Sequence, residues 1–580
     1  MGIRHLETFV RQNVPNGYFQ INIEEEIKKY TNNKNSQTFV PPVIVIDLMS
    51  LYYPVCQLDL AGLLCGGRFN RAEYVLDQFY TRLKNLNVTL AFYYDGPVQD
   101  TKYDTWATRQ DNKYQDMMQI TDAVRSMDLR DIVKRFARTI PSNTLYPVKQ
   151  VGMKYGSLRT AIDRECDQEL AAYANAVRAI AVISNDTDFM IFEGAWRYWS
   201  SKDIDLETLT TYEYNRPALV QHLRLNYKQM PMFATLGGND IIKYDEVKHF
   251  HNTLGPRNLN KFHKLANFVR NIPIGERLQT VLSRVFGRVA INDDLIYRFQ
   301  KSLEFYDTNY PAPEPGSKVD PVLEQIINLE NTFIYQLWVG HPVNVTTFFL
   351  DMRQPELGAQ FPNIALEVVL RQAGVILYHH QLLPNSSTCS VVIKLNHDAG
   401  HSLQEYPVVF PKHIAPPPLL DLLSTNPEVR ASLHDTKMRL YCWIVSDTLD
   451  IRLLQQVPAA LRETVVTVYF LLEKKIIKLF EGDLFLRVAF DVHFKTYNFD
   501  QIPYPKKLDY RAFHVSFMFI KFYTHFAKAF KALNIEVKDL LECPKYDGVL
   551  FHNMYANWQQ GLNDLEQIQQ WRIYKDLANN

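Results

Sequence analysis

The sequence predicts an α/β domain with a twisted, mainly parallel β-sheet, followed by a mostly α-helical second half. Three short runs in the first half are rich in β-branched or aromatic residues, and helical patterns separate them. The second half instead contains long apolar stretches with helical spacing. The chain of 580 residues is too long for one ordinary hydrophobic core, so two or more domains are expected.

The three runs have the composition of buried parallel strands. They are "PPVIVIDLMS", which begins with prolines, "NVTLAFYYDGP", which ends in Gly96 and Pro97, and "AIAVISND". Helical patterns cover about residues 71–85, 104–138 and 167–177. Strands that alternate with helices are typical of a doubly wound parallel sheet.

A Pro-rich stretch, "FYDTNYPAPEPGSKVDP" at 305–321, predicts a boundary or a long loop. We therefore expect a domain at 1–270, a connector at 271–321 and a helical domain at 322–580. In the last of these, "ALRETVVTVYFLLEKKIIKLF" and "AFHVSFMFIKFYTHFAKAFKAL" predict helices, and "YPVVFPKHIAPPPLLD" predicts a surface loop. This half contains no evident catalytic motif, and we expect it to bind a protein partner.

Composition excludes a global attraction to polyanions. Lys plus Arg and Asp plus Glu each number 63, so binding to nucleic acid would need a local patch. The six cysteines form no CxxC pair, which favours a reducing compartment and argues against a thiolate zinc site. The sequence has no signal-peptide pattern and no stretch of membrane-span length. We expect a cytoplasmic protein with no membrane partner, with the nucleus as a further location.

Acidic residues lie where predicted strands end or where helices begin. In parallel α/β sheets, ligands bind beyond the carboxyl ends of the strands, and these positions meet at one rim. We therefore expect one cluster that contains Asp47, Asp95, Glu165, Asp167, Asp186, Asp188 and Asp240.

Crowded carboxylates need a counter-charge to stay ionised. Hard divalent cations supply that charge, and two ions about 4 Å apart form the standard clamp for phosphodiester hydrolysis. The sequence thus predicts two bound Mg²⁺ or Mn²⁺ ions. For any single residue the simpler explanation is favoured: Asp167 could only cap its helix, and Asp95 could only help to turn the chain. For all seven residues in this order, the metal site is the better explanation.

The opening "MGIRHLETFV" resembles that of flap endonuclease and XPG-type nucleases. "VIVIDLMS", "FYYDGP", "ECDQELAAYA", "SNDTDF" and "LGGND" resemble the acidic blocks of these nucleases, in the same order, within about residues 1–270. The resemblance implies a PIN-like fold with a first metal held by Asp47, Asp95, Glu165 and Asp167. It also implies that Asp186 bridges both metals and that Asp188 and Asp240 hold the second.

A resemblance over most of the chain is to the constitutive coactivator of PPAR-gamma-like family. It is carried by "FHNTLGP", "YDGVLFHNMY" and "VPAALRETVVTVYFLLE". Members of that family are described as RNA-binding scaffolds and coactivators, and several have lost acidic positions. This sequence keeps all seven. The resemblance therefore leaves two functions open: a nuclease, or a catalytically silent RNA-binding scaffold or coactivator.

Two basic residues follow the "DGP" block. Lys102 and Arg109 are seven residues apart, so they are expected to project from one helix face. In the flap nucleases a basic pair placed in this way steers the scissile phosphate, and the resemblance implies that role here. The alternative is a solvated helix face.

A second basic group follows Asp240 and predicts a phosphate-binding surface. Its members chosen for nucleic-acid binding are Lys248, Arg257, Lys261 and Lys264. His249 and His251 could be a metal pair, but they lack a third ligand, so we expect ordinary surface or packing residues.

The substrate prediction rests on a departure from the flap nucleases. They carry a Gly-rich hairpin that grips duplex DNA, and no GxG run follows Asp240 here. We therefore expect a nuclease for single-stranded or flapped nucleic acid, with RNA favoured over DNA. Tyr93, Tyr103 and Trp106 could stack on bases or could simply pack in the fold.

Overall fold

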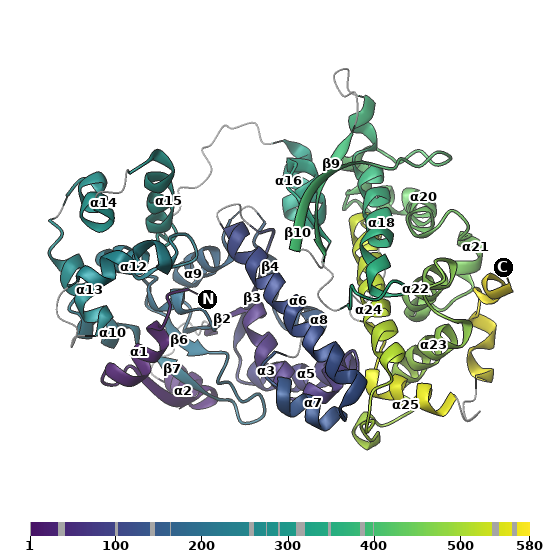
Figure 1. Ribbon diagram of the computed structural model, residues 1–580, viewed down its shortest axis with the longest axis horizontal. Helices are drawn as coiled ribbons and strands as arrows, with labels where there is room; N and C mark the ends of the chain where they lie inside the picture. The colour runs from purple at the N-terminus through teal and green to yellow at the C-terminus, as the bar shows by residue number, and fades with distance from the viewer. Residues whose placement is uncertain are drawn as a thin grey trace. The chain divides into compact units, whose positions relative to one another are not determined.

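The computed structural model describes residues 2–32, 41–98, 102–139, 145–162, 164–254, 260–273, 275–287, 291–308, 320–345, 350–382, 389–397, 400–535, 544–558 and 565–579 (Figure 1). The chain divides into two compact units. The first contains Met1–Pro54, Val75–Trp106 and Val151–Ser317, and the second contains Val55–Tyr74, Ala107–Gln150 and Lys318–Asn580. Both units take segments from the first third of the sequence. The domain limits at residues 270 and 321 therefore stay a prediction.

A seven-stranded sheet forms the centre of the first unit, in the order β1-β7-β6-β5-β2-β3-β4. Four neighbouring pairs are parallel, and the pairs β6/β7 and β1/β7 are antiparallel. The mainly parallel α/β class is thereby confirmed. The strands are β1 (Tyr18–Asn22), β2 (Val43–Asp47), β3 (Thr89–Tyr94), β4 (Ser157–Thr160), β5 (Ala181–Ser184), β6 (Arg197–Ser200) and β7 (Thr210–Tyr214).

The strands that the sequence predicts are three neighbouring interior ones, β5, β2 and β3. Ile44, Val45 and Ile46 of β2 are fully buried, as expected for a β-branched run between two covered faces. Ile46 is paired with Phe92 on one side and Ile183 on the other. This register brings the ends of the three strands to the same edge of the sheet.

Helices surround the sheet, and a single hydrophobic cluster joins its residues to Phe189, Phe233, Phe262 and Phe299. Among the described helices, α3 (Tyr52–Gln57), α5 (Phe69–Asn85), α6 (Tyr103–Ser126) and α8 (Leu145–Tyr155) pass from one unit into the other. The helices of the first unit alone are α1 (Leu6–Asn13), α2 (Ile23–Asn32), α9 (Cys166–Ala176), α10 (Arg216–Leu223), α11 (Met230–Gly237), α12 (Tyr244–Thr253), α13 (Lys261–Arg270), α14 (Leu278–Phe286) and α15 (Asp293–Glu304).

The second unit is mostly helical, as predicted, and also holds a three-stranded sheet in the order β10-β9-β8. The predicted helix at 104–138 is two helices, α6 and α7, separated at Met127 and Asp128. In the predicted loop "YPVVFPKHIAPPPLLD", the first two residues belong to β10 and the last three belong to α19. The residues between them form neither a helix nor a strand. The remaining elements are α3 (Tyr52–Gln57), which begins in the first unit, and α4 (Leu60–Leu64), α7 (Leu129–Phe136), α16 (Pro321–Asn328), α17 (Thr332–Val339), β8 (Val343–Val345), α18 (Phe361–Ile376), β9 (Ser390–His397), β10 (Gly400–Pro407), α19 (Leu419–Leu422), α20 (Pro427–Val445), α21 (Ile451–Gln455), α22 (Arg462–Glu473), α23 (Leu479–Phe494), α24 (Tyr510–Ala532) and α25 (Gly548–Trp558).

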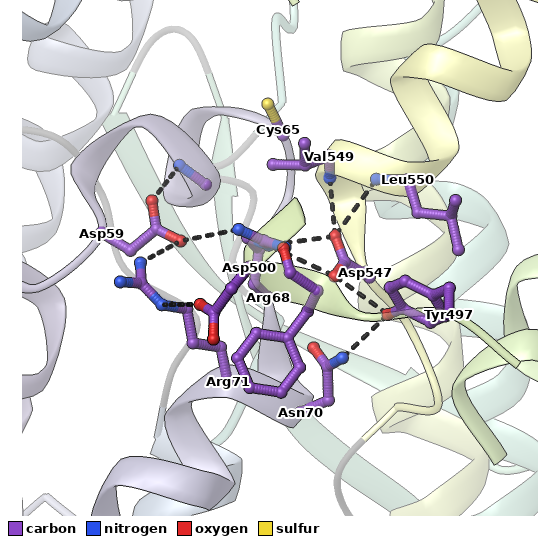
Figure 2. A network of polar contacts seen from close by, with 12 residues as sticks. Asp59, Cys65, Arg68, Asn70, Arg71, Tyr497, Asp500, Asp547, Val549 and Leu550 are labelled. Atoms are coloured by element: carbon purple, nitrogen blue, oxygen red, sulfur yellow. Dashed lines mark hydrogen bonds and ion pairs between the residues drawn. The ribbon is translucent and has the colours of Figure 1, made fainter. Parts of the chain in front are cut away.

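Within the second unit, a buried ion pair connects residues 59–71 with residues 497–550 (Figure 2). The Nε atom of Arg68 lies 3.2 Å from both carboxylate oxygens of Asp547, and the two residues are 5% and 0% exposed. Asp547 also accepts hydrogen bonds from the backbone N–H of Val549 and from the hydroxyl of Tyr497. Such a pair is costly to break because either charge would be left alone in the protein interior.

Across the described ranges, none of the helices has both the length and the apolar character that a membrane-crossing segment needs.

Candidate metal centre

Three of the predicted acidic residues meet at the carboxyl end of β5. Asp186 lies two residues after this strand ends, Asp188 lies in the short 3-10 helix Thr187–Met190, and Asp167 lies in the first turn of α9. Each offers one carboxylate oxygen, and these atoms all lie within 4.8 Å of one another. Asp188 is buried, and the other two are half-buried. Three carboxylates at this separation can share a divalent cation.

Asp47 joins this group from the end of β2. Its Oδ2 atom accepts a hydrogen bond of 2.7 Å from the Ser184 hydroxyl, and its Oδ1 atom accepts one of 3.0 Å from the backbone N–H of Met49. Burial raises the pKa of Asp47 to about 7, and the charges of Asp95 and Asp186 add to the increase. The carboxyl group is thus held in place while its negative charge is disfavoured.

The other pKa shifts show that the acidic residues act on one another. Burial and the charge of Asp186 raise the pKa values of Asp167 and Asp188 well above the ordinary range. Desolvation by the surrounding protein raises the pKa of Asp95, Lys102 opposes the increase, and Glu165 and Asp186 add to it. Crowded carboxylates of this kind are stabilised as anions only by added positive charge.

Lys102 supplies part of that charge. Its Nζ atom donates a hydrogen bond of 2.7 Å to Oε2 of Glu165 and lies 5.0 Å from the centre of the Phe305 ring. Burial acts to lower the pKa of Lys102, but Glu165 and Asp167 outweigh it, so the pKa is raised. The charge of Asp240 acts on Lys102 in the same direction. The ammonium group is therefore charged and lies among the carboxylates.

Arg109 lies on α6, in the part of that helix that belongs to the second unit, and Lys102 precedes the helix. Lys102 has a 3-10 conformation that continues directly into α6 at Tyr103, so the shared helix face stays a prediction. The role of Arg109 at the carboxylates stays a prediction.

Two neighbouring residues that the sequence does not single out position Asp188 and Asp240. The hydroxyl of Tyr306 donates a hydrogen bond of 2.6 Å to Oδ1 of Asp188. Asn239 donates to Ser302 Oγ at 2.8 Å, and its Oδ1 atom accepts from the backbone N–H of Ile242 at 2.9 Å, which fixes the turn that contains Asp240. Asn239 could be found from its place in "LGGND". Tyr306 could not, because it lies in the stretch that predicts a boundary loop.

Gly2 lies against the carboxylates of Asp186 and Asp188. Its φ is +64°, and a Cβ atom there would lie 2.5 Å from Oδ1 of Asp186 and 3.1 Å from Cγ of Asp188. The next residue, Ile3, donates its backbone N–H to Oγ1 of Thr187 at 2.8 Å. A side chain at position 2 would therefore push against the carboxylates.

We expect Gly2→Ala to weaken divalent-metal binding by roughly tenfold or more, because the added Cβ atom would displace the carboxylates of Asp186 and Asp188. A tenfold loss of affinity is a loss of about 1.4 kcal/mol of binding free energy. Isothermal titration with Mn²⁺ measures the change. Gly287→Ala is the matched control because Gly287 has nearly the same φ, +63°, with nothing within 4 Å of its Cβ position. Equal Mn²⁺ affinity in both variants would contradict the prediction.

The predicted basic surface lies on α12 and α13. Lys248 is exposed, and Lys261 and Lys264 are half-buried, while Arg257 lies outside the described residues. Lys261 donates to the backbone carbonyl of Arg4 at 2.9 Å, and burial and the Arg4 charge lower its pKa to about 8. Binding of nucleic acid by these lysines stays a prediction.

Two side chains can be assigned to packing. His251 is buried, and its Nε2 atom bonds the carbonyl of Leu236 at 2.7 Å, so it is a packing residue. Tyr93 is 3% exposed and packs against Tyr173, so of the two alternatives left open for it, packing in the fold holds. Tyr103 and Trp106 are half-exposed, and their stacking on bases stays a prediction.

Comparisons with known proteins find both coactivators and an endonuclease among the similar proteins. Residues 223–310 match the family described as FAM120A-like domain. The constitutive coactivator of peroxisome proliferator-activated receptor gamma of Mus musculus is 29% identical over 248 residues, which are 42% of this chain and 30% of that protein. The single-strand DNA endonuclease ASTE1 of Danio rerio is 24% identical over 233 residues, 38% of this chain and 32% of that protein.

Among solved structures, the catalytic core of Rad2 in complex with a DNA substrate is similar to 58% of this chain, with 94% of that chain covered, 13% identity and a TM-score of 0.31. The chain spans about a third of the length of the curated relatives that it matches. The predicted resemblance to the constitutive coactivators of PPAR-gamma is confirmed by these matches.

Proposed function

We propose that this chain is a two-metal nuclease that hydrolyses phosphodiester bonds of single-stranded or flapped nucleic acid, with RNA favoured over DNA. The observation that carries the proposal is the convergence of Asp167, Asp186 and Asp188 within 4.8 Å. A similarity to an endonuclease named for single-stranded DNA supports the same reaction class and the single-stranded substrate.

The donor set fits Mg²⁺ or Mn²⁺. All of its atoms are carboxylate oxygens, the ligands that these hard cations prefer, and several of the groups are driven toward protonation by one another. In the proposed arrangement Asp186 lies between two ions. The first would be held by Asp47, Asp95, Glu165 and Asp167, and the second by Asp188 and Asp240. Bound ions of this kind supply an activated water and neutralise charge on the phosphate.

The protein side chains orient the substrate and the ligands. A small, partly open hollow beside the carboxylates is lined by Lys102, Asp188, Asn239, Asp240, Ile241 and Phe305. The hollow is too small to enclose a phosphate, so a phosphate would bind at its rim, where it would contact the Lys102 ammonium in exchange for part of the contact with Glu165. Tyr306 and Ser184 hold Asp188 and Asp47 by hydrogen bonds, which fixes the donor atoms before substrate arrives.

The proposal is tested with end-labelled single-stranded RNA, single-stranded DNA, a 5′-flap duplex and a blunt duplex, each with Mg²⁺, Mn²⁺ or EDTA. We expect cleavage of the single-stranded and flapped substrates with either metal and none in EDTA. Products should carry a 5′-phosphate and a 3′-hydroxyl. The absence of cleavage on every substrate with both metals would exclude the nuclease.

A second candidate function is a catalytically silent RNA-binding scaffold or coactivator. The names of the mouse and related proteins support it, and the helical second unit would then bind the protein partner. This function predicts RNA binding that is unchanged by EDTA and by loss of the Asp186 charge, with no cleavage. The two candidates are therefore separated by the same set of assays.

The metal-free protein should lose stability as pH rises. The folded-state pKa of Asp47 is about 7, against 3.8 as the ordinary value, so its contribution to stability is complete at low pH and is lost as pH rises through about 7. In EDTA, the thermal midpoint should fall between about pH 5 and about pH 8. Mg²⁺ or Mn²⁺ at 100 times its Kd should restore about 2.7 kcal/mol at the higher pH.

Differential scanning fluorimetry across this pH range, with EDTA or with metal, measures the effect. Asp47→Asn should reduce the pH dependence in EDTA because it removes one carboxyl group with a raised pKa, while Asp95, Asp167 and Asp188 keep theirs. A metal-induced shift that is equal at low and high pH would contradict the prediction.

A further inference from the structure

A series of buried hydrogen bonds in the first unit ends at one of the predicted metal ligands. It joins, in order, the side chains of Thr235, Ser302, Asn239, Tyr306 and Asp188. The successive distances between donor and acceptor atoms are 2.7, 2.8, 3.3 and 2.6 Å. Asn239, at 7%, is the most exposed of the five, so the series is closed to solvent. We refer to the first four residues as the Tyr306 network.

Asn239 fixes the direction of these hydrogen bonds. Its Oδ1 atom accepts from the backbone N–H groups of Ile241 and Ile242 at 3.0 and 2.9 Å, so its Nδ2 atom is the donor to the Tyr306 hydroxyl. Because that hydroxyl accepts from Asn239, its own proton is directed to Oδ1 of Asp188. The network therefore holds Asp188 as a hydrogen-bond acceptor, the form in which a carboxylate also binds a cation.

Tyr306 is itself held by its ring and by the backbone around it. The ring packs against Phe192, with the two ring centres 5.4 Å apart. Gln168 of α9 binds the backbone on both sides, because its Nε2 atom donates to the carbonyls of Glu304 and Asp307 at 3.0 and 2.8 Å. A group that is fixed in this way can orient a metal-ligating carboxylate before the ion binds.

The network acts on one side of the carboxylate cluster. The turn that Asn239 fixes contains Asp240, so the same side chain orders the surroundings of both Asp188 and Asp240. These two carboxylates are the ligands that the proposed function assigns to the second ion. Asp47, a ligand assigned to the first ion, is instead held by the hydroxyl of Ser184. The two proposed ion sites therefore have separate supporting groups.

We propose that residues 223–310, the segment similar to the FAM120A-like domain, build the site of the second ion, with Tyr306 as a positioning residue. The Tyr306 network and Asp240 all lie in this segment. The inference rests on the proposed two-metal site and adds that loss of the network weakens one ion and leaves the other. A residue that only supported the fold would weaken both ions alike.

Isothermal titration of the full chain with Mn²⁺ tests the proposal, because it measures both binding steps without a substrate. Tyr306→Phe keeps the buried ring and removes only the hydroxyl. We expect one step to weaken by about 10–100-fold, the usual effect of losing a group that orients a metal ligand, and the other step to stay unchanged. Ser302→Ala removes an acceptor of Asn239 and should weaken the same step by a smaller factor, so the proposal stays testable if Tyr306→Phe folds poorly.

Tyr80→Phe is the matched control. Tyr80 is also fully buried in the first unit, and its hydroxyl has no hydrogen-bond partner within the described part of the chain. Both binding steps should be unchanged in this variant. In the background of Asp188→Asn, Tyr306→Phe should cause no further loss of affinity, because its effect passes through that carboxylate. Equal weakening of both steps, or an undiminished loss in the Asp188→Asn background, would overturn the proposal.

Cleavage measured in parallel keeps this inference apart from the proposed function. A selective loss of one binding step in Tyr306→Phe, with no cleavage by the unchanged chain, would refute only the nuclease. Cleavage by the unchanged chain, with both steps unaltered in Tyr306→Phe, would refute only this inference. Binding of fewer than two ions by the unchanged chain would overturn the inference together with the two-metal arrangement.

Discussion

Asp186→Asn is expected to lower metal-dependent cleavage by at least about 10²–10³-fold, the range that follows removal of one preorganised charge-stabilising group. Asp186 lies at the centre of the candidate site. It meets Asp167 and Asp188 within 4.8 Å, and its charge raises the pKa values of both residues and of Asp47.

The same variant should be more stable than the unchanged chain when metal is removed. Neutralising Asp186 relieves repulsion on Asp167 and Asp188, so the thermal midpoint in EDTA should rise while the shift on adding Mn²⁺ becomes small. Lost activity together with increased metal-free stability separates a ligand from a residue that only supports the fold.

Asp293→Asn is the matched control because Asp293 is an exposed aspartate of the first unit, in the first turn of α15. It should leave both cleavage and the Mn²⁺ shift unchanged. Cleavage by Asp186→Asn at the rate of this control would show that Asp186 is not a ligand of the reactive metals. Lower stability of Asp186→Asn in EDTA would show that the carboxylate is compensated by protein groups.

The central strands could be predicted because their signal is local. Residues of β2 and β5 are buried on both faces and therefore form continuous β-branched runs. The edge strands carry no such signal: in β4, Ser157 and Arg159 are exposed, and in β1, Phe19 and Gln20 are exposed. These strands are determined by pairing with neighbours distant in sequence, such as Tyr18 with Tyr214.

The acidic residues of the site could be predicted for the same reason, since each follows a recognisable strand end or begins a helix. The residues that hold these carboxylates in place could not be predicted. Tyr306 meets Asp188 across 118 positions of sequence, and Ser184 meets Asp47 across 137. Each of these contacts depends on how distant segments pack, which no periodicity records. Gly2 had a place in a recognised block, but its close contact with Asp186 is visible only in three dimensions.

Breaking the buried ion pair of the second unit is expected to cause the largest loss of stability. Arg68→Ala should lower the free energy of unfolding by about 3–5 kcal/mol because it leaves Asp547 as an uncompensated buried charge. The partners of Arg68 make this cost plausible on structural grounds: besides Asp547, it contacts Asp59 at 3.9 Å and the carbonyl of Phe499 (Figure 2). Urea unfolding followed by circular dichroism measures the change.

Two further variants test whether the unpaired charge, and not the lost contact area, sets the size of this loss of stability. Arg439→Ala removes a mostly exposed i,i+4 pair with Asp435, and such pairs contribute only about 0.3–0.5 kcal/mol. The double variant Arg68→Met with Asp547→Leu removes both charges while keeping apolar volume, so it should be clearly more stable than Arg68→Ala. If Arg68→Ala and the double variant lost the same stability, the cost would come from packing around the side chains, and the ion pair would add little to the stability of the second unit.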